Sequence, residues 1–325
     1  MEKIEKSNFI ANKKQLPEKT GIFYFSKKNR ILYIGYTANL QRAVSTYFTE
    51  NPEDKNIIQL ISLTDEINYR IEDDLFSAFV SAKILIDQKN PEFNHYIQNH
   101  KDFVYLGIDF HNPPFFKIME DTQDDLYYLG AFESRFMLLD FIESLNKIAK
   151  LPNCSSEEFP CELLKFDECD GYCLKDNPEK VEMIFNYYLF PNGDLEKRLE
   201  DEQEKLMDNL EFLKAELIKK QLSIIKKYYQ RLKFLITTKD LNCLIEDEKY
   251  KFQIESGLIR KISGSDMQVE FHVEKVDFRA NEILAIEKKY LAEAWFVYKK
   301  VNDLKPELVN KLYQENKEKL IKILN

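Results

Sequence analysis

Four cysteines lie within twenty residues and form the densest group of metal-ligating side chains in the sequence. Cys154, Cys161, Cys169 and Cys173 follow the spacing C-x6-C-x7-C-x3-C. Thiolates are soft, charged ligands, and four of them suit either a structural Zn²⁺ ion or an iron–sulfur cluster. The spacing therefore predicts a metal site within residues 154–173 rather than four unconnected thiols. Cys243 stands apart and is expected to be a small core side chain.

Two short apolar runs, residues 21–25 and 31–35, flank a polar turn and predict a β-hairpin. They contain Gly21-Ile22-Phe23 and Tyr33-Ile34-Gly35, which resemble the paired signature of the GIY-YIG nuclease family. Segments at 39–48, 77–86 and 90–94 resemble the UvrC branch of that family, the nuclease subunit of bacterial nucleotide excision repair. The resemblance to the N-terminal half of UvrC extends from residue 15 to about residue 235.

The resemblance also implies where the catalytic groups of such a module would stand. Cleavage of a phosphodiester needs a metal held by a carboxylate, an activated water and a cation beside the phosphate. The family uses a Tyr, an Arg and a Glu, but Phe23, Ala43 and Ala82 occupy those three positions here. Tyr33 keeps the second signature tyrosine. We therefore expect a degenerate site that neither holds Mg²⁺ or Mn²⁺ nor cuts DNA. The alternative is an atypical structure-specific endonuclease that uses Arg42 in place of the missing cation.

The resemblance bears on the cysteines as well. Their spacing from Cys161 onward is similar to that of the UvrC cluster, which is associated with a [4Fe-4S] centre. The resemblance therefore favours a [4Fe-4S] cluster as the cofactor. The residues alone leave Zn²⁺ open as the alternative.

The stretch from Asp194 to Ile236 contains no Gly or Pro and predicts a long helical hairpin. Residues 194–211 contain eight acids and three bases, whereas residues 214–233 contain seven bases and one acid. An acidic helix is therefore expected to fold back on a basic one. Six leucines in this stretch have the spacing expected at the seam of a coiled coil. They are Leu195, Leu199, Leu206, Leu210, Leu213 and Leu217.

The segment that begins at Leu210 resembles the UVR motif, through which UvrC meets UvrB. The resemblance implies a UvrB-like or exonuclease partner that docks on residues 195–235. A solvated hairpin whose charges only maintain solubility is the competing interpretation.

Basic and aromatic side chains are interleaved in the second half of this hairpin and predict a DNA contact. Lysine and arginine neutralise phosphates, and tyrosine can stack on an unpaired base. The predicted DNA-binding residues are Lys219, Lys220, Lys226, Lys227, Tyr228, Arg231 and Lys233. The competing interpretation is that these cations only balance the acidic helix before them.

The remaining patterns place these groups in an α+β fold. Helices are expected at residues 39–48 and 75–88, with a strand at residues 66–71 between them. Together with the hairpin they form, at residues 1–98, a small α/β module with a mixed three-stranded sheet. A linker region with the cysteine cluster follows at 99–190. The helical hairpin then occupies 191–240, and a small C-terminal α+β region occupies 241–325.

Composition limits the remaining classes of function. The 325 residues have a net charge of −9, so a DNA contact must rely on a local basic patch. The N-terminus lacks the apolar core of a signal peptide, and no run is long enough for a membrane helix. The sequence therefore predicts a cytoplasmic protein with no membrane partner. A protein-interaction or assembly factor that makes no contact with DNA is the third hypothesis.

Overall fold

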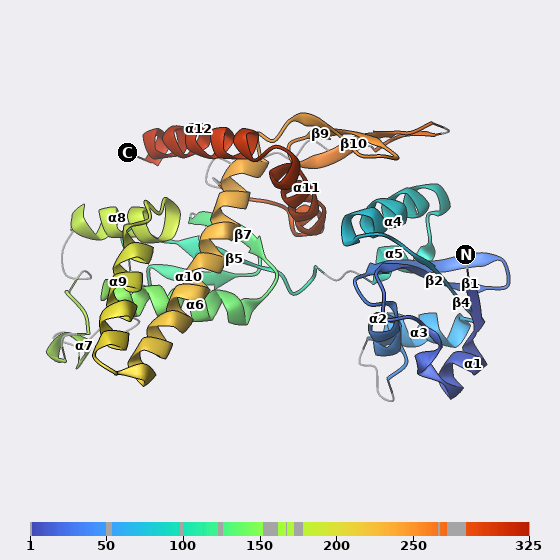
Figure 1. Cartoon of the computed structure of the whole chain (residues 1–325), viewed down its shortest axis with the longest axis horizontal. Helices are drawn as coiled ribbons and strands as arrows, with labels where there is room; N and C mark the ends of the chain where they lie inside the picture. Colours follow the sequence, from blue (N-terminus) through green and yellow to red (C-terminus); the bar gives the residue numbers. More distant parts are fainter. Residues whose placement is uncertain are drawn as a thin grey trace. The chain divides into compact units, whose positions relative to one another are not determined.

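The chain divides into two compact units, Met1–Lys101 and Asp102–Asn325, and each is treated by itself. The structure is a computed structural model, and its elements are labelled in Figure 1. The residues that it describes are 2–49, 54–97, 100–112, 114–122, 126–151, 162–166, 168–171, 178–265, 267–271 and 284–324. The α+β fold class predicted from the sequence is confirmed.

The first unit is built on a four-stranded sheet. Its strands are β1 (Glu2–Glu5), β2 (Gly21–Lys27), β3 (Arg30–Thr37) and β4 (Glu66–Ile71). They follow the spatial order β1-β4-β2-β3, and every neighbouring pair is antiparallel. The prediction of a mixed three-stranded sheet is therefore wrong in both respects. The additional strand, β1, pairs with β4 at the edge of the sheet, with Ile4 opposite Ile67.

Helices cover both faces of this sheet (Figure 1). They are α1 (Lys6–Ala11), the 3-10 helix η1 (Lys13–Gln15), α2 (Leu40–Tyr47), α3 (Lys55–Leu63), α4 (Leu75–Lys89) and α5 (Glu92–Tyr96). On one face, α4 packs Ala78 and Ala82 against Ile22 and Ile34. The opposite face forms a larger core with side chains from α1, α2, α3 and α5.

Local polar residues determine where the two predicted helices of this unit begin. The Asn39 side chain accepts a hydrogen bond from the Arg42 N–H at the start of α2, and Asp74 accepts one from Ser77 at the start of α4. Asn90, in the left-handed conformation at φ 44°, ends α4 before Pro91. The predicted helices at 39–48 and 75–88 are thus confirmed to within two residues at each end.

The second unit begins with a second four-stranded sheet. Its strands β5 (Val104–Ile108), β6 (Phe116–Met119) and β7 (Tyr127–Phe132) are antiparallel, and β12 (Leu284–Ala285) adds a parallel strand beside β7. Segments from the predicted 99–190 and 241–325 regions thus share one sheet. Helix α6 (Arg135–Ala149) follows β7, and α10 (Phe212–Thr238) packs against α6.

The predicted helical hairpin consists of α9 (Asp194–Asp208) and α10, which fold back on one another (Figure 1). The turn between them places Leu210 at φ 61°. Leu195 and Leu199 are buried in the hairpin, but the predicted seam does not continue. Leu210, Leu213 and Leu217 are exposed, so their assignment to the seam is wrong. On α10 the buried positions start at Ala215 and shift to Leu222 and Ile225.

The C-terminal part consists of a β-meander and two helices. Its strands β8 (Cys243–Glu246), β9 (Lys251–Glu255), β10 (Leu258–Ser263) and β11 (Gln268–Glu270) pair in sequence order. The helical segments of the rest of this unit are α7 (Glu162–Lys165), α8 (Pro178–Ile184), the π-helix η2 (Phe185–Leu189), the 3-10 helix η3 (Lys288–Tyr290), α11 (Leu291–Leu304) and α12 (Pro306–Leu324).

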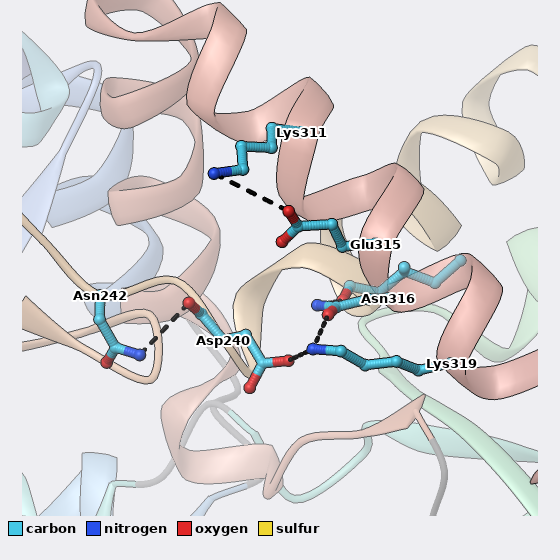
Figure 2. Close-up of polar contacts among 7 residues, drawn as sticks. Asp240, Asn242, Lys311, Glu315, Asn316 and Lys319 are labelled. Carbon is cyan, nitrogen blue, oxygen red and sulfur yellow. Dashed lines mark hydrogen bonds and ion pairs between the residues drawn. The ribbon is translucent and has the colours of Figure 1, made fainter.

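Helix α12 is attached to the end of α10 by polar contacts. The buried Asn316 side chain donates to the Ile236 carbonyl at 2.9 Å. Figure 2 shows Lys319 reaching both Asn316 and Asp240, with Nζ 3.8 Å from the Asp240 carboxylate. The C-terminal helix therefore fixes the end of α10 within the same compact unit.

Candidate functional site

An open cleft of about 610 Å³ lies at the signature residues of the first unit. Strands β2 and β3 provide one wall, and α2, α3, α4 and α5 contribute the remainder. The residues that line it are Phe23, Tyr33, Ile34, Gly35, Tyr36, Thr37, Ala43, Thr46, Tyr47, Ile57, Ile86, Asn94, Ile97 and His100. The sequence-based account missed Ile57, Ile97 and His100. The signal for α3 was present in Asp54, which caps it by accepting from the Asn56 N–H, and in the apolar spacing of the helix.

The signature glycine of β3 has a packing role in this cleft. Phe23 lies opposite Gly35 across the β2–β3 hairpin, and its ring is buried against the glycine. A Cβ atom at position 35 would stand 2.4 Å from Cζ of Phe23, closer than packed atoms approach. Gly35 is therefore needed because the Phe23 ring occupies the space where its side chain would be.

Two phenols meet at the centre of the cleft. The Tyr47 hydroxyl donates to the Tyr33 hydroxyl at 3.0 Å, and both rings pack on Phe25. Burial raises the pKa of Tyr33 above its usual range, and burial together with the neighbouring Tyr33 raises the pKa of Tyr47. Both phenols are therefore neutral at physiological pH, because the charged phenolate form is disfavoured in this environment.

Asn94 fixes the wall of the cleft in place. Its side-chain oxygen accepts from the Ile34 N–H at 2.9 Å, and its side-chain nitrogen donates to the Ile34 carbonyl at 2.8 Å. These two bonds join α5 to the strand that carries Tyr33. The side chain is thus engaged with the scaffold.

The two positions where the resemblance places an arginine and a glutamate are uncharged alanines here. Ala43 lines the cleft, whereas Ala82 is 1% exposed and packs in the apolar layer between α4 and the sheet. Arg42, the predicted replacement cation, is exposed on α2 and is absent from the cleft lining. None of the lining residues within the described part of the chain is an aspartate, glutamate, lysine or arginine.

Three of the four predicted cysteine ligands, Cys154, Cys161 and Cys173, lie outside the described residues. Cys169 is described and is buried, and its sulfur accepts a hydrogen bond from the Gly171 N–H at 3.2 Å. The described residues contain no group of three His, Cys, Asp or Glu side chains placed to hold a metal ion. The metal site therefore stays a prediction.

The predicted DNA-binding residues of α10 fall into different environments. Tyr228 is buried, its ring is stacked on Phe141 at a centroid distance of 3.2 Å, and its hydroxyl donates to the Tyr188 carbonyl. The prediction that this ring stacks on an unpaired base is wrong, because both the ring and the hydroxyl are used in the core. Arg231 is also buried, and it forms an ion pair of 2.8 Å with Glu133.

The lysines of the same set differ in whether they have partners. Lys219 pairs with Glu216 on its own helix, Lys226 pairs with Glu200 on α9, and Lys233 donates to Asn310. The Lys226–Glu200 pair agrees with the alternative interpretation, in which the cations balance the acidic helix. Lys220 and Lys227 are exposed and form no ion pair with any described residue.

The module in the first unit belongs to a recognised class. Residues 19–95 match the family model described as the UvrC-like GIY-YIG domain. The chain therefore contains a UvrC-like GIY-YIG module, as the signature predicted.

The curated relatives that match a longer segment are UvrC proteins. UvrABC system protein C of Ligilactobacillus salivarius is 28% identical over 235 residues, which cover 70% of this chain and 40% of the relative. The same protein of Ruminiclostridium cellulolyticum is 24% identical over 241 residues, covering 69% of this chain and 39% of the relative. The chain thus matches about two fifths of the length of these relatives.

Solved structures of the GIY-YIG N-terminal endonuclease domain of UvrC from Thermotoga maritima are also similar to this chain. A point mutant bound to the catalytic divalent cation is 25% identical and covers 27% of this chain and 97% of its own, with a TM-score of 0.26. The magnesium-bound domain is 24% identical, with coverage of 27% and 98% and the same TM-score.

None of the described helices is both long and apolar enough to span a membrane.

Proposed function

We propose that this chain is a UvrC-like protein of DNA repair or processing that binds DNA or a repair partner and whose GIY-YIG module does not cut DNA. The observation that carries the proposal is the lining of the cleft, which within the described residues includes His100 but no aspartate, glutamate, lysine or arginine. Hydrolysis of a phosphodiester requires a metal ion and stabilisation of the charge that develops on phosphorus. The described lining has no carboxylate to hold such a metal and no lysine or arginine beside the phosphate.

The tyrosines of the cleft support the same proposal. A phenol helps to activate water only if it can accept a proton, and burial keeps both Tyr33 and Tyr47 in the protonated form. Phe23 lacks the hydroxyl altogether. The two phenols and Asn94 are occupied with one another or with the backbone of β3, so their retention preserves the scaffold.

DNA binding is the activity that we propose for the remainder of the chain. The exposed lysines of α10 support this proposal. Their contacts with DNA phosphates would be electrostatic. Binding of fluorescein-labelled DNA, followed by anisotropy, is expected to weaken steeply between about 50 and 200 mM salt. Addition of EDTA is expected to leave the affinity unchanged, since no cleft metal takes part. Affinity that requires Mg²⁺ or Mn²⁺ would count against the proposal.

Binding of a protein partner is a second proposed activity. A surface that we call the hairpin tip favours it. We use this name for five exposed apolar side chains at the turn between α9 and α10. They are Met207, Leu210, Phe212, Leu213 and Leu217. Exposed apolar clusters of this kind usually mark a contact surface. Acidic side chains flank the cluster at Asp208, Glu211 and Glu216, so we propose that it docks a UvrB-like partner through an apolar centre with a polar rim.

Substitution of Leu213 tests the hairpin tip. Leu213 is 86% exposed, so Leu213→Asp is expected to leave the melting temperature unchanged. Loss of a central apolar contact should weaken binding of purified UvrB, measured by calorimetry, by about tenfold or more. Leu244→Asp, an exposed leucine on β8, is the matched control and should bind normally. Equal binding by both variants would exclude the tip as the docking surface.

The cysteine cluster is proposed to hold a [4Fe-4S] centre through Cys154, Cys161, Cys169 and Cys173, with Zn²⁺ as the alternative. The N–H of Gly171 that points at Cys169 fits this role, because hydrogen bonds to sulfur stabilise a charged metal-bound thiolate. Bound in this way, the metal would connect the chain segments that carry the four cysteines.

Metal analysis of cysteine variants tests this proposal. Protein purified without oxygen is expected to contain iron and sulfide, and Cys169→Ser should lose most of both. Cys243→Ser is the matched control and should retain them, because Cys243 lies on β8 away from the cluster segment. Stoichiometric zinc in place of iron would select the alternative, and full metal retention in Cys169→Ser would contradict the ligand assignment.

A further inference from the structure

A cavity of about 240 Å³ lies in the second unit between α6, α10 and the end of β7. Its apolar surface includes the rings of Phe132, Phe141 and Tyr228, which are stacked on one another. Its polar groups are Asp140, Lys227 and Arg231. The volume equals about eight water molecules at ~30 Å³ each, which is comparable with one nucleobase.

Arg231 lines this cavity, and one of its hydrogen-bond donors, buried beside the cavity, is unused. The side chain is 8% exposed and lies over the Trp295 ring at 4.3 Å, and its Nη2 pairs with Glu133 at 2.8 Å. The other terminal nitrogen, Nη1, is buried and has no acceptor within the described part of the structure. A buried donor without a partner costs free energy, and a ligand that supplies an acceptor removes that cost.

The cavity lies on a distinct stripe of α10. Lys220, Ile224, Lys227 and Arg231 are separated by four, three and four residues, so they share one side of the helix. Ile224, Lys227 and Arg231 line the cavity, and Lys220 continues the stripe toward the hairpin tip. Among the described residues, Lys220 and Lys227 have neither an ion pair nor a side-chain hydrogen bond, whereas Lys214, Lys219 and Lys226 form ion pairs and Lys233 donates to Asn310.

We propose that this cavity receives one unpaired nucleobase of single-stranded DNA, while Lys220 and Lys227 bind the neighbouring phosphates. The proposal rests on the DNA binding proposed above and names the part of DNA that α10 recognises. A nucleobase combines an apolar planar body with acceptors for Arg231 and N–H donors, such as the N3–H of thymine, for Asp140. A partner carboxylate fits less well, because Glu133 already pairs with Arg231 and the Asp140 carboxylate in the lining would repel a second anion.

The test compares two fluorescein-labelled oligothymidines of equal length, one intact and one with a single central abasic site. A short length that holds one protein molecule places the abasic site at the cavity. The wild-type protein is expected to bind the intact strand on the order of 10-fold more tightly. Ile224→Trp fills the cavity and should remove this preference while leaving the affinity for the abasic strand unchanged. Because the first comparison uses the wild-type protein, it does not depend on how the variant folds.

A charge-matched pair of variants tests the phosphate contacts. Lys220→Gln is expected to reduce the slope of log affinity against log salt by about 0.7 for a single strand. Lys219→Gln makes the same charge change one residue away but removes a lysine that already pairs with Glu216, so its slope should be unchanged.

The possible outcomes separate this proposal from the proposed function. Salt-dependent binding with equal affinity for intact and abasic strands would overturn the base cavity and leave DNA binding in place. Equal weakening of both strands by Ile224→Trp would also overturn it, since the helix surface rather than the cavity would then be responsible. If the wild-type protein binds neither strand at low salt, both proposals fail, and a protein ligand becomes the interpretation of the cavity.

Discussion

Replacement of Tyr228 by alanine is expected to lower the free energy of unfolding of the second unit by about 3–5 kcal/mol, the range for large core aromatics. The ring is stacked between Phe141 and Phe132, and its hydroxyl donates to the Tyr188 carbonyl at 2.7 Å. Truncation removes both ring contacts and leaves that buried carbonyl without its donor. Chemical denaturation followed by fluorescence suits the measurement, because the single tryptophan of the chain, Trp295, lies in this unit.

Tyr228→Phe is the matched control for this prediction. It keeps the stacked ring and removes only the hydroxyl, so a smaller loss of about 1–3 kcal/mol is expected from the unpaired carbonyl. Unchanged stability of Tyr228→Ala together with weaker binding of single-stranded DNA would restore the surface-stacking role that the sequence suggested. It would also show that the arrangement of α6 and α10 described above is incorrect.

Replacement of Gly35 by alanine is the second substitution with a large expected effect. The new Cβ would stand 2.4 Å from Cζ of Phe23, whose side chain is 2% exposed and cannot move without displacing Phe25 or Tyr47. Overpacking of this kind costs about 1–3 kcal/mol. Hydrogen exchange in peptides from β2 and β3 reports it, since the first unit contains no tryptophan.

A double-mutant cycle identifies the cause of this loss. In a Phe23→Ala background the ring is absent, so Gly35→Ala should cost little, and the two substitutions should be strongly non-additive. Additive effects would indicate that Gly35 is required for its backbone conformation instead. The signature glycine would then have no packing relation to the phenylalanine that replaces the catalytic tyrosine.

The first unit was largely predictable because its signals are local. The apolar runs of β2 and β3, the alternation in β4 and the caps at Asn39 and Asp74 define elements without reference to the remainder of the chain. Strand β1 was missed because it is short and consists mostly of charged residues. It becomes a strand only because the edge of β4 is available to pair with it.

The second unit was less predictable because its key contacts are distant in sequence. A Lys- and Tyr-rich helix is consistent with a DNA surface, and only the packing of α6 and η2 against α10 buries Tyr228 and Arg231. The leucine spacing of the hairpin was similarly misleading. Leu213 and Leu217 continue the period of Leu195 and Leu199, but they follow the turn and therefore lie on the outward side of a second helix.

The sequence predicted the signature residues Phe23, Tyr33 and Ala43 of the cleft but not the rest of its lining. Alanine at position 43 leaves the α2 wall of the cleft uncharged, and alanine at position 82 packs in the apolar layer beneath α4. The structure further places Ile57 and Ile97 in the lining and keeps Arg42 outside it. Those positions depend on α3 and α5, whose placement no local pattern reveals.

A nicking assay on branched and damaged DNA in the presence of Mg²⁺ or Mn²⁺ tests the central claim most directly. We predict no metal-dependent cutting above background by the full chain, and the same result for Tyr33→Phe. Metal-dependent cutting by the wild-type chain that disappears in Tyr33→Phe would contradict the account, because it would assign a working active site to the cleft.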